Sequence, residues 1–352
     1  MTSAVGTPAI PLTGARRLIG ASFDLLGQAS EEMRRASFYI GVITLGTLGP
    51  LALASWAMQV RTVHLTVAQG TALAEGAAGN WTAVLLIPAF VGVLVAFIES
   101  RILGAAILGA RMVGRPLTAD QALARSRMVF GRSVLAAFIA GIPLSIGQVL
   151  ISGLVDALLP VGSEGTFLAL FLSSVTVGAW FAYVLCGVVL GDVGPGDAIV
   201  RSFRVYRPRK VAAAIVALFE ATAALLLVLG LSAGLDVALR AFDALGLGTD
   251  AGPAGLVLVT IGIIVALFAF GTLILTVMAI SVAPQVVMFV GLTHATQGLE
   301  HVRPGRDHDP AIRHGSRPPF RVFTRPMTGM IVVAWVILAV VVAIVASSTG
   351  AG

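Results

Sequence analysis

Charged residues, cysteine and lysine are all scarce in this sequence. Only 11% of its 352 residues are charged and 57% are hydrophobic, whereas about 25% of the residues in a soluble domain are charged. Lys210 is the only lysine and Cys186 the only cysteine. The single cysteine excludes disulfides within the chain and CxxC metal sites, and the composition as a whole excludes an ordinary soluble protein.

The sequence signatures of common catalytic sites are also missing. The chain has no phosphate-binding glycine loop ending in Lys-Ser or Lys-Thr and no HExxH pair, and its GxSxG match, GLSAG at 230–234, lies inside an apolar run rather than at a turn. We therefore expect a protein that is not an enzyme and that carries no cofactor.

A histidine-rich segment at 294–325 is the one place where a metal site is conceivable. Imidazole and carboxylate groups are good metal ligands, and the segment contains His294, His301, His308, His314, Asp307 and Asp309. Pro304 prevents these side chains from sharing one helical face. We favour a solvated basic loop and predict no metal site.

Long apolar runs make up most of the chain. They lie at 38–59, 82–110, 134–159, 166–191, 211–238, 255–291 and 327–347. About 20 apolar residues in a helix cross the hydrocarbon core of a bilayer, and helices satisfy their own backbone hydrogen bonds there. The sequence thus predicts an all-α integral membrane protein with seven transmembrane helices. A disordered tail at 1–12 precedes a single membrane domain at 13–352.

Four prolines lie inside these runs, namely Pro50, Pro88, Pro143 and Pro284. Proline removes a backbone donor and clashes with the preceding turn, so each is expected to kink or break its helix. The sixth run would form about 55 Å of helix, which is longer than a bilayer is thick. We expect it to project into the cytoplasm or to break near Pro284.

Basic residues are distributed unevenly between the runs. The segments before runs one, three, five and seven hold almost all of them: Arg16, Arg17, Arg34, Arg35; Arg111, Arg115, Arg125, Arg127, Arg132; Arg201, Arg204, Arg207, Arg209, Lys210; and Arg303, Arg306, Arg313, Arg317, Arg321, Arg325. The alternate loops hold only Arg61 and Arg240. The positive-inside rule therefore predicts a cytoplasmic N-terminus and an external C-terminus in a bacterial inner membrane. The same bias explains the net charge of +6 better than nucleic-acid binding does.

Two similar decapeptides each precede an apolar run: QALARSRMVF at 121–130 and DAIVRSFRVY at 197–206, with a weaker echo, IGASFDLLGQ, at 19–28. Alignment of 118–141 with 194–217 pairs Ala122 with Ala198, Arg125 with Arg201, Ser126 with Ser202, Val129 with Val205, Ala136 with Ala212, Ala137 with Ala213 and Ile139 with Ile215. We interpret them as parallel repeats of one interfacial helix and two spans. The units are about 13–112, 113–191 and 192–291, with a partial unit at 292–347; chance similarity between low-complexity membrane segments is the alternative.

Helical spacing places the small and apolar residues of each copy on one face. These are Leu18, Ser22, Leu25, Leu26 and Ala29; Ala119, Ala122, Leu123, Ser126 and Phe130; and Ala198, Ile199, Ser202 and Tyr206. Thr118 and Gln121 have the spacing of a capping box, and Gly194 followed by Pro195 suits a helix start. The pattern predicts short amphipathic helices in the membrane interface.

The segment DAIVRSFRVYRPRK, followed by a two-helix membrane unit, resembles the membrane domain associated with bacterial glycerophosphodiester phosphodiesterases. The similarity covers about 13–300. In that family the hydrolase activity belongs to a separate soluble barrel, for which this sequence leaves no segment of suitable size. The resemblance implies a membrane fold and argues against a phosphodiesterase.

Charged residues inside the spans are candidates for a functional site, because they are costly in a membrane and are usually paired or functional. They are Glu99, Arg101, Asp156, Glu220 and Asp236. Glu220 is the clearest, as a proton or ligand site or as a structural partner of Arg101 or of a hydroxyl group. We favour the structural role. Gly230 and Gly234 form a GxxxG pair, which predicts close helix packing within the chain or between chains.

The basic helices are expected to contact the head groups of anionic lipids. The residues concerned are Arg125, Arg127, Arg132, Arg201, Arg204, Arg207, Arg209 and Lys210. We predict a non-catalytic membrane scaffold or a subunit that binds a protein partner on its cytoplasmic face, with membrane lipids as further partners and no nucleic acid. A transporter or permease component for a small or lipidic solute is the alternative.

Overall fold

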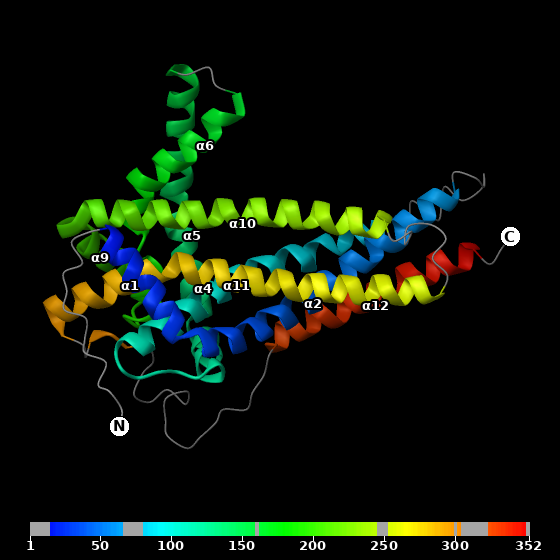
Figure 1. Ribbon diagram of the computed structural model, residues 1–352, viewed down its shortest axis with the longest axis horizontal. Coiled ribbons are helices and arrows are strands. Elements are labelled where there is room, and N and C mark those ends of the chain that lie inside the picture. The colour runs from blue at the N-terminus through cyan, green and yellow to red at the C-terminus, as the bar shows by residue number, and fades with distance from the viewer. Residues whose placement is uncertain are drawn as a thin grey trace. The chain divides into compact units, whose positions relative to one another are not determined.

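The computed structural model describes residues 15–65, 80–158, 162–244, 253–298, 301–303 and 323–349. Over this part of the chain the regular structure is helical, without a strand (Figure 1). Seven helical segments are long and apolar enough to cross a membrane: Ser30–Trp56, Asn80–Met112, Ala119–Leu158, Phe167–Val189, Pro195–Gly234, Val257–Gln297 and Arg325–Ile344. Each overlaps one predicted run, so the all-helical, multi-pass membrane fold is confirmed.

The helices are α1 (Ala15–Gln28), α2 (Ser30–Leu65), α4 (Leu86–Met112), α5 (Ala119–Leu158), α6 (Gly162–Ser173), α7 (Ala179–Phe181), α8 (Val184–Val189), α9 (Pro195–Tyr206), α10 (Lys210–Ala244), α11 (Pro253–Gln297) and α12 (Arg325–Thr349). A π-helix, η1 (Ser174–Gly178), joins α6 to α7, and a 3₁₀ turn, η2 (Arg207–Arg209), joins α9 to α10.

Contacts divide the chain into two compact units. Unit 1 comprises 1–36, 98–227 and 275–320, and unit 2 comprises 37–97, 228–274 and 321–352. The single membrane domain predicted at 13–352 therefore contains two units, and each takes in part of α2, α4, α10 and α11.

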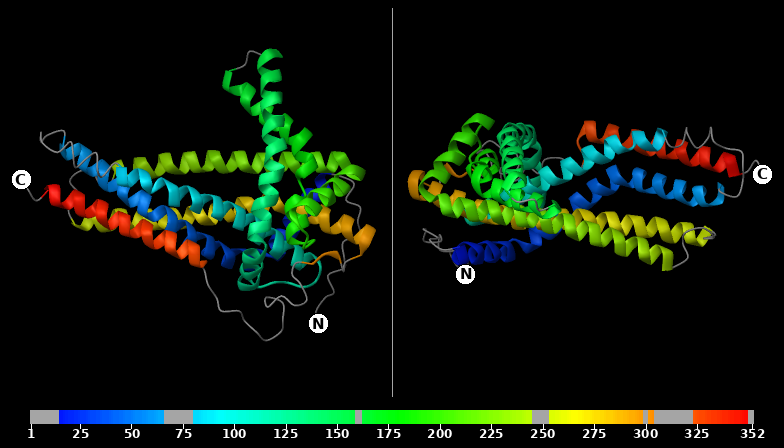
Figure 2. Two further views of the ribbon diagram at one scale, coloured as in Figure 1. Left: turned by 180° about the vertical axis from the view of Figure 1, so that it is seen from behind. Right: turned by 90° about the horizontal axis from the view of Figure 1, so that it is seen from above.

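In unit 1, α5 packs against α6, α8 and α9, and α8 packs against α9. Figure 2 shows α5 and α6 side by side from behind. A glycine brings α8 and α9 together, because a Cβ atom at Gly187 would lie 3.1 Å from the Cα of Ala198. Small residues at such contacts let helix backbones approach closely in a membrane.

The predicted helix starts at α5 and α9 are confirmed. The Thr118 backbone N–H donates to Gln121 Oε1 (3.0 Å), and the Gln121 N–H donates to Thr118 Oγ1 (3.4 Å), which is a reciprocal capping box. Glu32 Oε2 accepts a further hydrogen bond, of 2.8 Å, from the Ala119 N–H. Gly194 is the N-cap of α9, and Pro195 is its first residue.

The faces predicted from the decapeptides are largely buried, although the copies differ in form. Buried members include Leu18, Ser22, Leu25 and Ala29; Ala119, Ala122, Leu123 and Ser126; and Ala198 and Ser202. The first and third copies form the separate helices α1 and α9, whereas the second forms the first turns of the continuous helix α5. Pro208 lies in the turn that separates α9 from α10 and removes a backbone donor there. The repeat itself stays a prediction.

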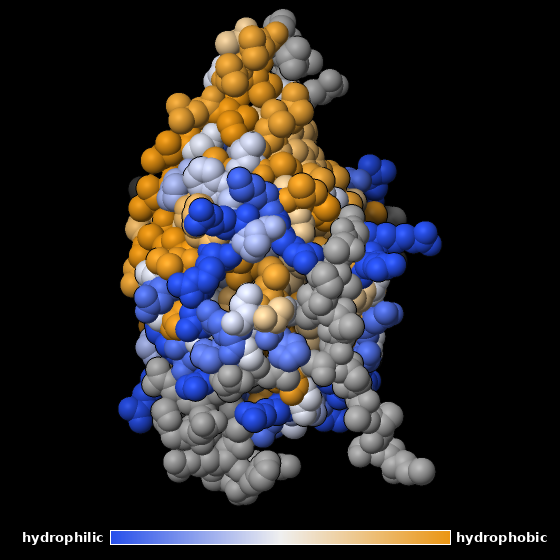
Figure 3. Space-filling view, turned by 90° about the vertical axis from the view of Figure 1, so that its left-hand side faces the viewer, coloured by the Kyte–Doolittle hydropathy of each residue, from blue (hydrophilic) through white to orange (hydrophobic). Residues whose placement is uncertain are grey.

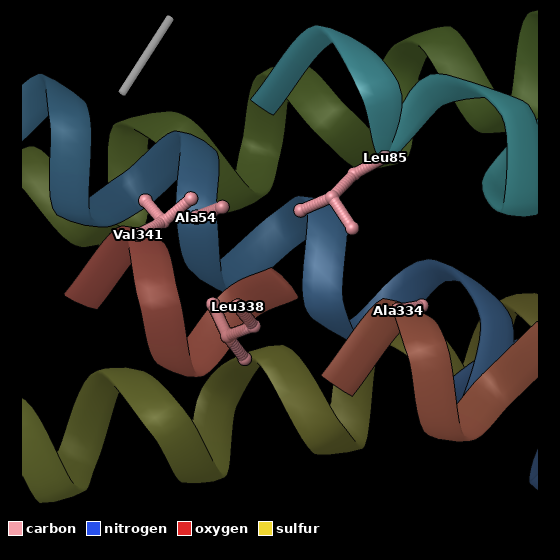
Figure 4. Packing of buried hydrophobic residues seen from close by; sticks show 5 residues of the cluster. All are labelled: Ala54, Leu85, Ala334, Leu338 and Val341. Carbon is pink, nitrogen blue, oxygen red and sulfur yellow. The ribbon is translucent and has the colours of Figure 1, made fainter. Parts of the chain in front are cut away.

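Unit 2 is held together by small and aliphatic residues. Figure 4 shows its buried cluster of Ala54, Leu85, Ala334, Leu338 and Val341, from α2, the turn at residue 85 and α12. Elsewhere in the unit α2 and α11 approach closely, because a Cβ atom at Gly271 would lie 2.7 Å from the Cα of Gly41. Thr44 Oγ1 donates to the Leu267 carbonyl at 3.0 Å across the same contact.

The prolines do not break the spans. α2, α5 and α11 run without interruption through Pro50, Pro143 and Pro284, so a break of the sixth span near Pro284 is ruled out. Pro88 lies in the first turn of α4, where a missing N–H costs little. The interruption lies instead in the fourth span, between α6 and α8, in a stretch that contains no proline.

Candidate ligand cavity

A cavity of about 340 Å³ lies within unit 1. Residues of α4, α5, the interrupted fourth span and α10 form its walls. Alanines line much of it on two helices: Ala136, Ala137 and Ala140 of α5, and Ala217, Ala221 and Ala224 of α10. Their short side chains leave space between helices that larger residues would fill, so the cavity follows directly from the sequence of these two faces.

An ion pair between Arg101 of α4 and Glu220 of α10 lies at the wall of this cavity. The two side chains are 32% and 30% exposed. Gln285 of α11 donates a second hydrogen bond, of 2.8 Å, from Nε2 to the other carboxylate oxygen, Oε2. Both oxygens of Glu220 therefore have partners. This is the pairing with Arg101 that the sequence suggested for a structural role.

The cavity retains unused donor capacity. Ser133 is buried, with 1% of its surface exposed, and in the described part of the chain its Oγ has no hydrogen-bond partner. Arg101 Nε is likewise buried without a partner among the described residues. The other serine of the lining, Ser174, already donates to the Leu170 carbonyl at 2.8 Å. A buried polar group without a partner is costly, and both of these donors belong to residues that line the cavity.

The fourth span owes its irregular form to a side chain from α9. Between η1 and α8 the backbone leaves the α-helical pattern at Ala182 and Tyr183. Ser202 Oγ donates to the Trp180 carbonyl (2.8 Å) and accepts from the Tyr183 N–H (3.2 Å). The serine thus satisfies two backbone groups that the break exposes. Ser174, Gly178, Phe181 and Ala182 of this region line the cavity.

A second polar cluster is buried in unit 1 beside the loop that follows α8. Arg125, 1% exposed at its side chain, pairs with Asp192 at 3.1 Å and donates to the Val189 carbonyl at 2.9 Å. Arg132 pairs with the same Asp192 oxygen at 2.9 Å. Asp192 has a φ of 50°, a left-handed conformation that Asp and Asn adopt more readily than most residues. A third pair joins Arg127 to the fully buried Glu99 at 2.7 Å.

The structure brings together only some of the charged residues proposed as site residues. Glu99, Arg101 and Glu220 all lie in unit 1, in ion pairs. Asp156 is exposed at the far end of α5. Asp236 is exposed and pairs with Arg240, one turn along α10, at 2.8 Å. Ser133, Asp192, Gln285 and Ser202 were not proposed as site residues, although Ser202 belongs to the repeated face.

The basic residues divide into inward and outward groups. The prediction of lipid contact is wrong for Arg125, because its side chain is buried on Asp192 and the α8 backbone. Arg127 and Arg132, at 21% and 30% exposure, also engage carboxylates. Arg204, Arg207 and Lys210 are exposed, whereas Arg201 and Arg209 are half-buried.

An aromatic cluster lies beside the exposed basic residues Arg204 and Arg207. Trp180, Phe203 and Tyr206 pack in edge-on or tilted orientations with ring centroids 5.8–6.5 Å apart, and Trp180 and Phe203 are 45% and 49% exposed. Val200, Phe203, Arg204, Arg207 and Pro208 line a shallow groove there. Figure 3 shows hydrophilic side chains gathered on one face of this unit, below the hydrophobic end formed by α5 and α6. The mixture of rings and arginines matches the composition of a membrane interface.

Neither glycine of the predicted packing pair makes a close helix contact within the described residues. Gly230 and Gly234 are exposed, and a Cβ atom at Gly234 would meet nothing within 4 Å. Close packing occurs instead at Gly41 and Gly271. Contact between copies through Gly230 and Gly234 stays a prediction.

The predicted histidine-rich segment falls mostly outside the described residues. His294 lies in the last turn of α11 and His301 just beyond it, but His308, His314, Asp307 and Asp309 are not described. Among the residues that are described, no three potential ligands come close enough to hold a metal ion.

No protein-family model, curated protein or solved structure matches this chain. The resemblance to the membrane domain associated with glycerophosphodiester phosphodiesterases thus stays a prediction from sequence.

Proposed function

We propose that this chain is a membrane-embedded binding protein for an amphipathic molecule and acts as a carrier or permease component. The observation that supports the proposal is the cavity in unit 1, with its alanine walls and its Arg101–Glu220 pair. Of the two functions considered from sequence, this is the one that accounts for a cavity between the helices. A scaffold would need only packed helices and an outer surface.

The size and composition of the cavity support this choice. Ligand sites in proteins typically have volumes of about 300–1,000 Å³ and apolar walls with a few polar groups that orient the ligand. This cavity has about 340 Å³ and four polar residues in a lining that is otherwise apolar. The π-helix in its wall adds to the argument, because such irregular turns are frequent at functional sites.

Photo-crosslinking tests the proposal. A single-chain amphiphile with a photoreactive tail is incubated with the protein in zwitterionic nanodiscs, and mass spectrometry locates the adducts. We expect adducts concentrated on the cavity faces of α5 and α10. Ala140→Phe fills the cavity from α5 and should abolish most of them, because Ala140 is 6% exposed and lines the space.

The matched control is Val149→Phe, on the same helix but outside the cavity lining and 70% exposed. It should leave the adducts unchanged. Labelling spread evenly over the lipid-facing residues of all spans, or adducts that survive Ala140→Phe, would contradict the proposal. Flux of the amphiphile across proteoliposomes, compared between the two variants, then separates a carrier from a binding protein that does not transport.

A second surface supports a role in lipid contact at the membrane interface. We propose that the outward face of α9 holds anionic head groups, with Arg204 and Arg207 as the cationic contacts and Trp180 and Phe203 at the depth of the interface. The exposed rings and arginines on this face support it, because rings anchor at the interface and basic side chains attract anionic lipids.

The orientation in a bacterial inner membrane is also part of this proposal. The positive-inside bias predicts that the N-terminus is cytoplasmic and the C-terminus external. In inverted inner-membrane vesicles an epitope tag at the N-terminus should be cleaved by added protease, and one at the C-terminus should be protected. The reverse pattern would overturn the orientation without affecting the cavity.

A further inference from the structure

We propose that the ligand of the cavity is an anionic amphiphile whose carboxylate or phosphate is held by Arg101 and Ser133 and whose apolar chain lies between the alanine faces of α5 and α10. This inference rests on the proposed function and specifies the chemistry of the ligand.

Glu220 is the only carboxylate among the residues that line the cavity, and both of its oxygens are engaged. One Glu220 oxygen faces the Arg101 guanidinium and the other accepts from Gln285 at 2.8 Å. A cationic ligand would have to displace one of these partners to reach Glu220. The carboxylate therefore serves better as a counter-ion for Arg101 than as a ligand contact.

The donors are only partly used. An arginine has five N–H donors and no acceptor, and Arg101 directs one terminal nitrogen at Glu220 while its Nε has no partner among the described residues. The Ser133 hydroxyl, 1% exposed and also without a partner in the described part of the chain, lines the same cavity. Unused donors from α4 and α5 fit an oxygen-rich anion, since guanidinium groups bind carboxylate and phosphate through paired hydrogen bonds.

The remaining wall fits an apolar chain. The alanines of α5 and α10, with Leu144, Leu170 and Phe181, give the cavity a hydrophobic surface beyond its polar residues. At about 340 Å³ the space lies near the lower end of the usual range for ligand sites. It suits one acyl chain of moderate length better than an entire two-chain phospholipid.

The Arg101–Glu220 pair predicts that neutralising one partner changes the affinity for an anion in the opposite direction from neutralising the other. The ligand anion competes with Glu220 for Arg101, so neutralising Glu220 should strengthen binding of the anion and neutralising Arg101 should weaken it. A purely structural pair would respond in the same direction to both substitutions, because either one leaves a charge without its partner.

The test is a competition assay on the full-length protein in zwitterionic nanodiscs with a fluorescent fatty-acid probe. The competitors share one tail: dodecanoate, dodecyl phosphate, dodecanol and dodecylamine. We expect at least one of the two anions to compete about tenfold better than dodecanol, the effect of one charge-assisted hydrogen bond. Whichever of dodecanoate and dodecyl phosphate competes better identifies the head group as carboxylate or phosphate.

Three variants identify the residues that cause the preference for an anionic competitor. Glu220→Gln should increase the preference for the anion, and the double variant Arg101→Gln/Glu220→Gln, which removes both charges together, should abolish it. Ser133→Ala should reduce it, whereas Ser145→Ala, an exposed serine of α5 outside the lining, should not change it.

The outcomes separate this inference from the proposed function. If no amphiphile displaces the probe and Ala140→Phe does not affect probe binding, the proposed function fails. If dodecanol or dodecylamine competes as well as the anions, or if the double variant keeps the anion preference, the cavity still binds amphiphiles but the assignment of an anionic ligand is overturned.

Discussion

Units 1 and 2 differ in the kinds of side chain that are buried between their helices. In unit 2, the described buried side chains are almost all aliphatic, with Thr44 and Thr47 as the polar exceptions, and α2 meets α11 at Gly41 and Gly271. In unit 1, three sets of ion pairs and several buried serines lie between the helices. Both units consist of apolar spans, so hydrophobicity alone does not account for the difference.

The contrast between the units fits the function proposed above for unit 1. Lipid tails are as apolar as leucine, so helices in a membrane associate through close packing and hydrogen bonds rather than through a hydrophobic driving force. Unit 2 shows that small residues suffice for that in this protein. The buried charges of unit 1 cost far more than such packing requires, which supports a role in binding rather than in assembly.

The largest expected effect comes from removing the charge of Asp192. Asn keeps the shape and tolerates the left-handed backbone, but Asp192→Asn leaves Arg125 and Arg132 without their shared carboxylate. Breaking a buried pair of this kind costs about 3–5 kcal/mol of unfolding free energy. Thermal unfolding in detergent measures the loss. Asp236→Asn, which breaks the exposed pair with Arg240 in unit 2, should cost no more than about 1 kcal/mol. Equal losses of stability in the two variants would contradict the difference between the units.

The close contact in unit 2 should be sensitive to a single methyl group. In Gly271→Ala the new Cβ would lie 2.7 Å from Gly41 Cα, and overpacking against backbone costs about 1–3 kcal/mol. Gly234→Ala places its Cβ in open space and should leave unfolding unchanged. A change of oligomeric state in size-exclusion chromatography for Gly234→Ala would show that the GxxxG pair joins two copies.

Ser126 and Ser202 occupy aligned positions in the two decapeptides, but we expect them to contribute differently to the stability of unit 1. Ser202→Ala removes the partner of the Trp180 carbonyl and the Tyr183 N–H, and buried groups left unsatisfied cost about 1–3 kcal/mol. Ser126 occupies the aligned position in α5, but its buried Oγ has no partner in the described part of the chain. Ser126→Ala should therefore be neutral in thermal unfolding. A larger loss for Ser126→Ala than for Ser202→Ala would contradict this assignment.

The smallest effect concerns the outward face of α9. Replacing Arg204 and Arg207 by Gln should weaken the association with anionic lipid by more than about tenfold and lower the amount that copurifies, since each basic side chain near a membrane surface contributes about 1 kcal/mol. Arg240→Gln, on unit 2, is the control, because Arg240 already pairs with Asp236. Lipid analysis by mass spectrometry gives the ratio. Unchanged lipid content in the double variant would favour a protein partner on that face.

Sequence reasoning predicted the long apolar helices and the starts of α5 and α9, because hydrophobic length, the Thr118–Gln121 box and the Gly194-Pro195 pair are local signals. It also identified the faces that carry Ser126 and Ser202, since helical spacing decides which residues share a side. Breaks were predicted less well. The helices continue through Pro50, Pro143 and Pro284, whereas the irregular part of the fourth span is hydrogen-bonded by Ser202 of α9, which lies 19–22 residues further along the chain.

The site was predicted only in part. Glu220 and Arg101 stood out because charge inside an apolar run is visible in sequence, and the structure pairs them. Gln285, Ser133 and Asp192 did not stand out, because an uncharged polar residue in a span or an aspartate in a loop has no distinctive local pattern. The cavity depends on alanines from two helices facing one another, and alanine is too common in this chain to mark such a face.

The burial of Cys186 in α8 has a practical consequence for experiments. It is the only thiol of the protein and is fully enclosed, so reagents that need an exposed sulfur should not reach it in the folded state. Any cysteine introduced at an exposed position, such as Asp120 or Asp197, then becomes the single reactive point of an otherwise native sequence. Spin labels or fluorophores can be attached there without first removing Cys186, and reactivity of the unmodified chain becomes a direct signal that α8 has opened.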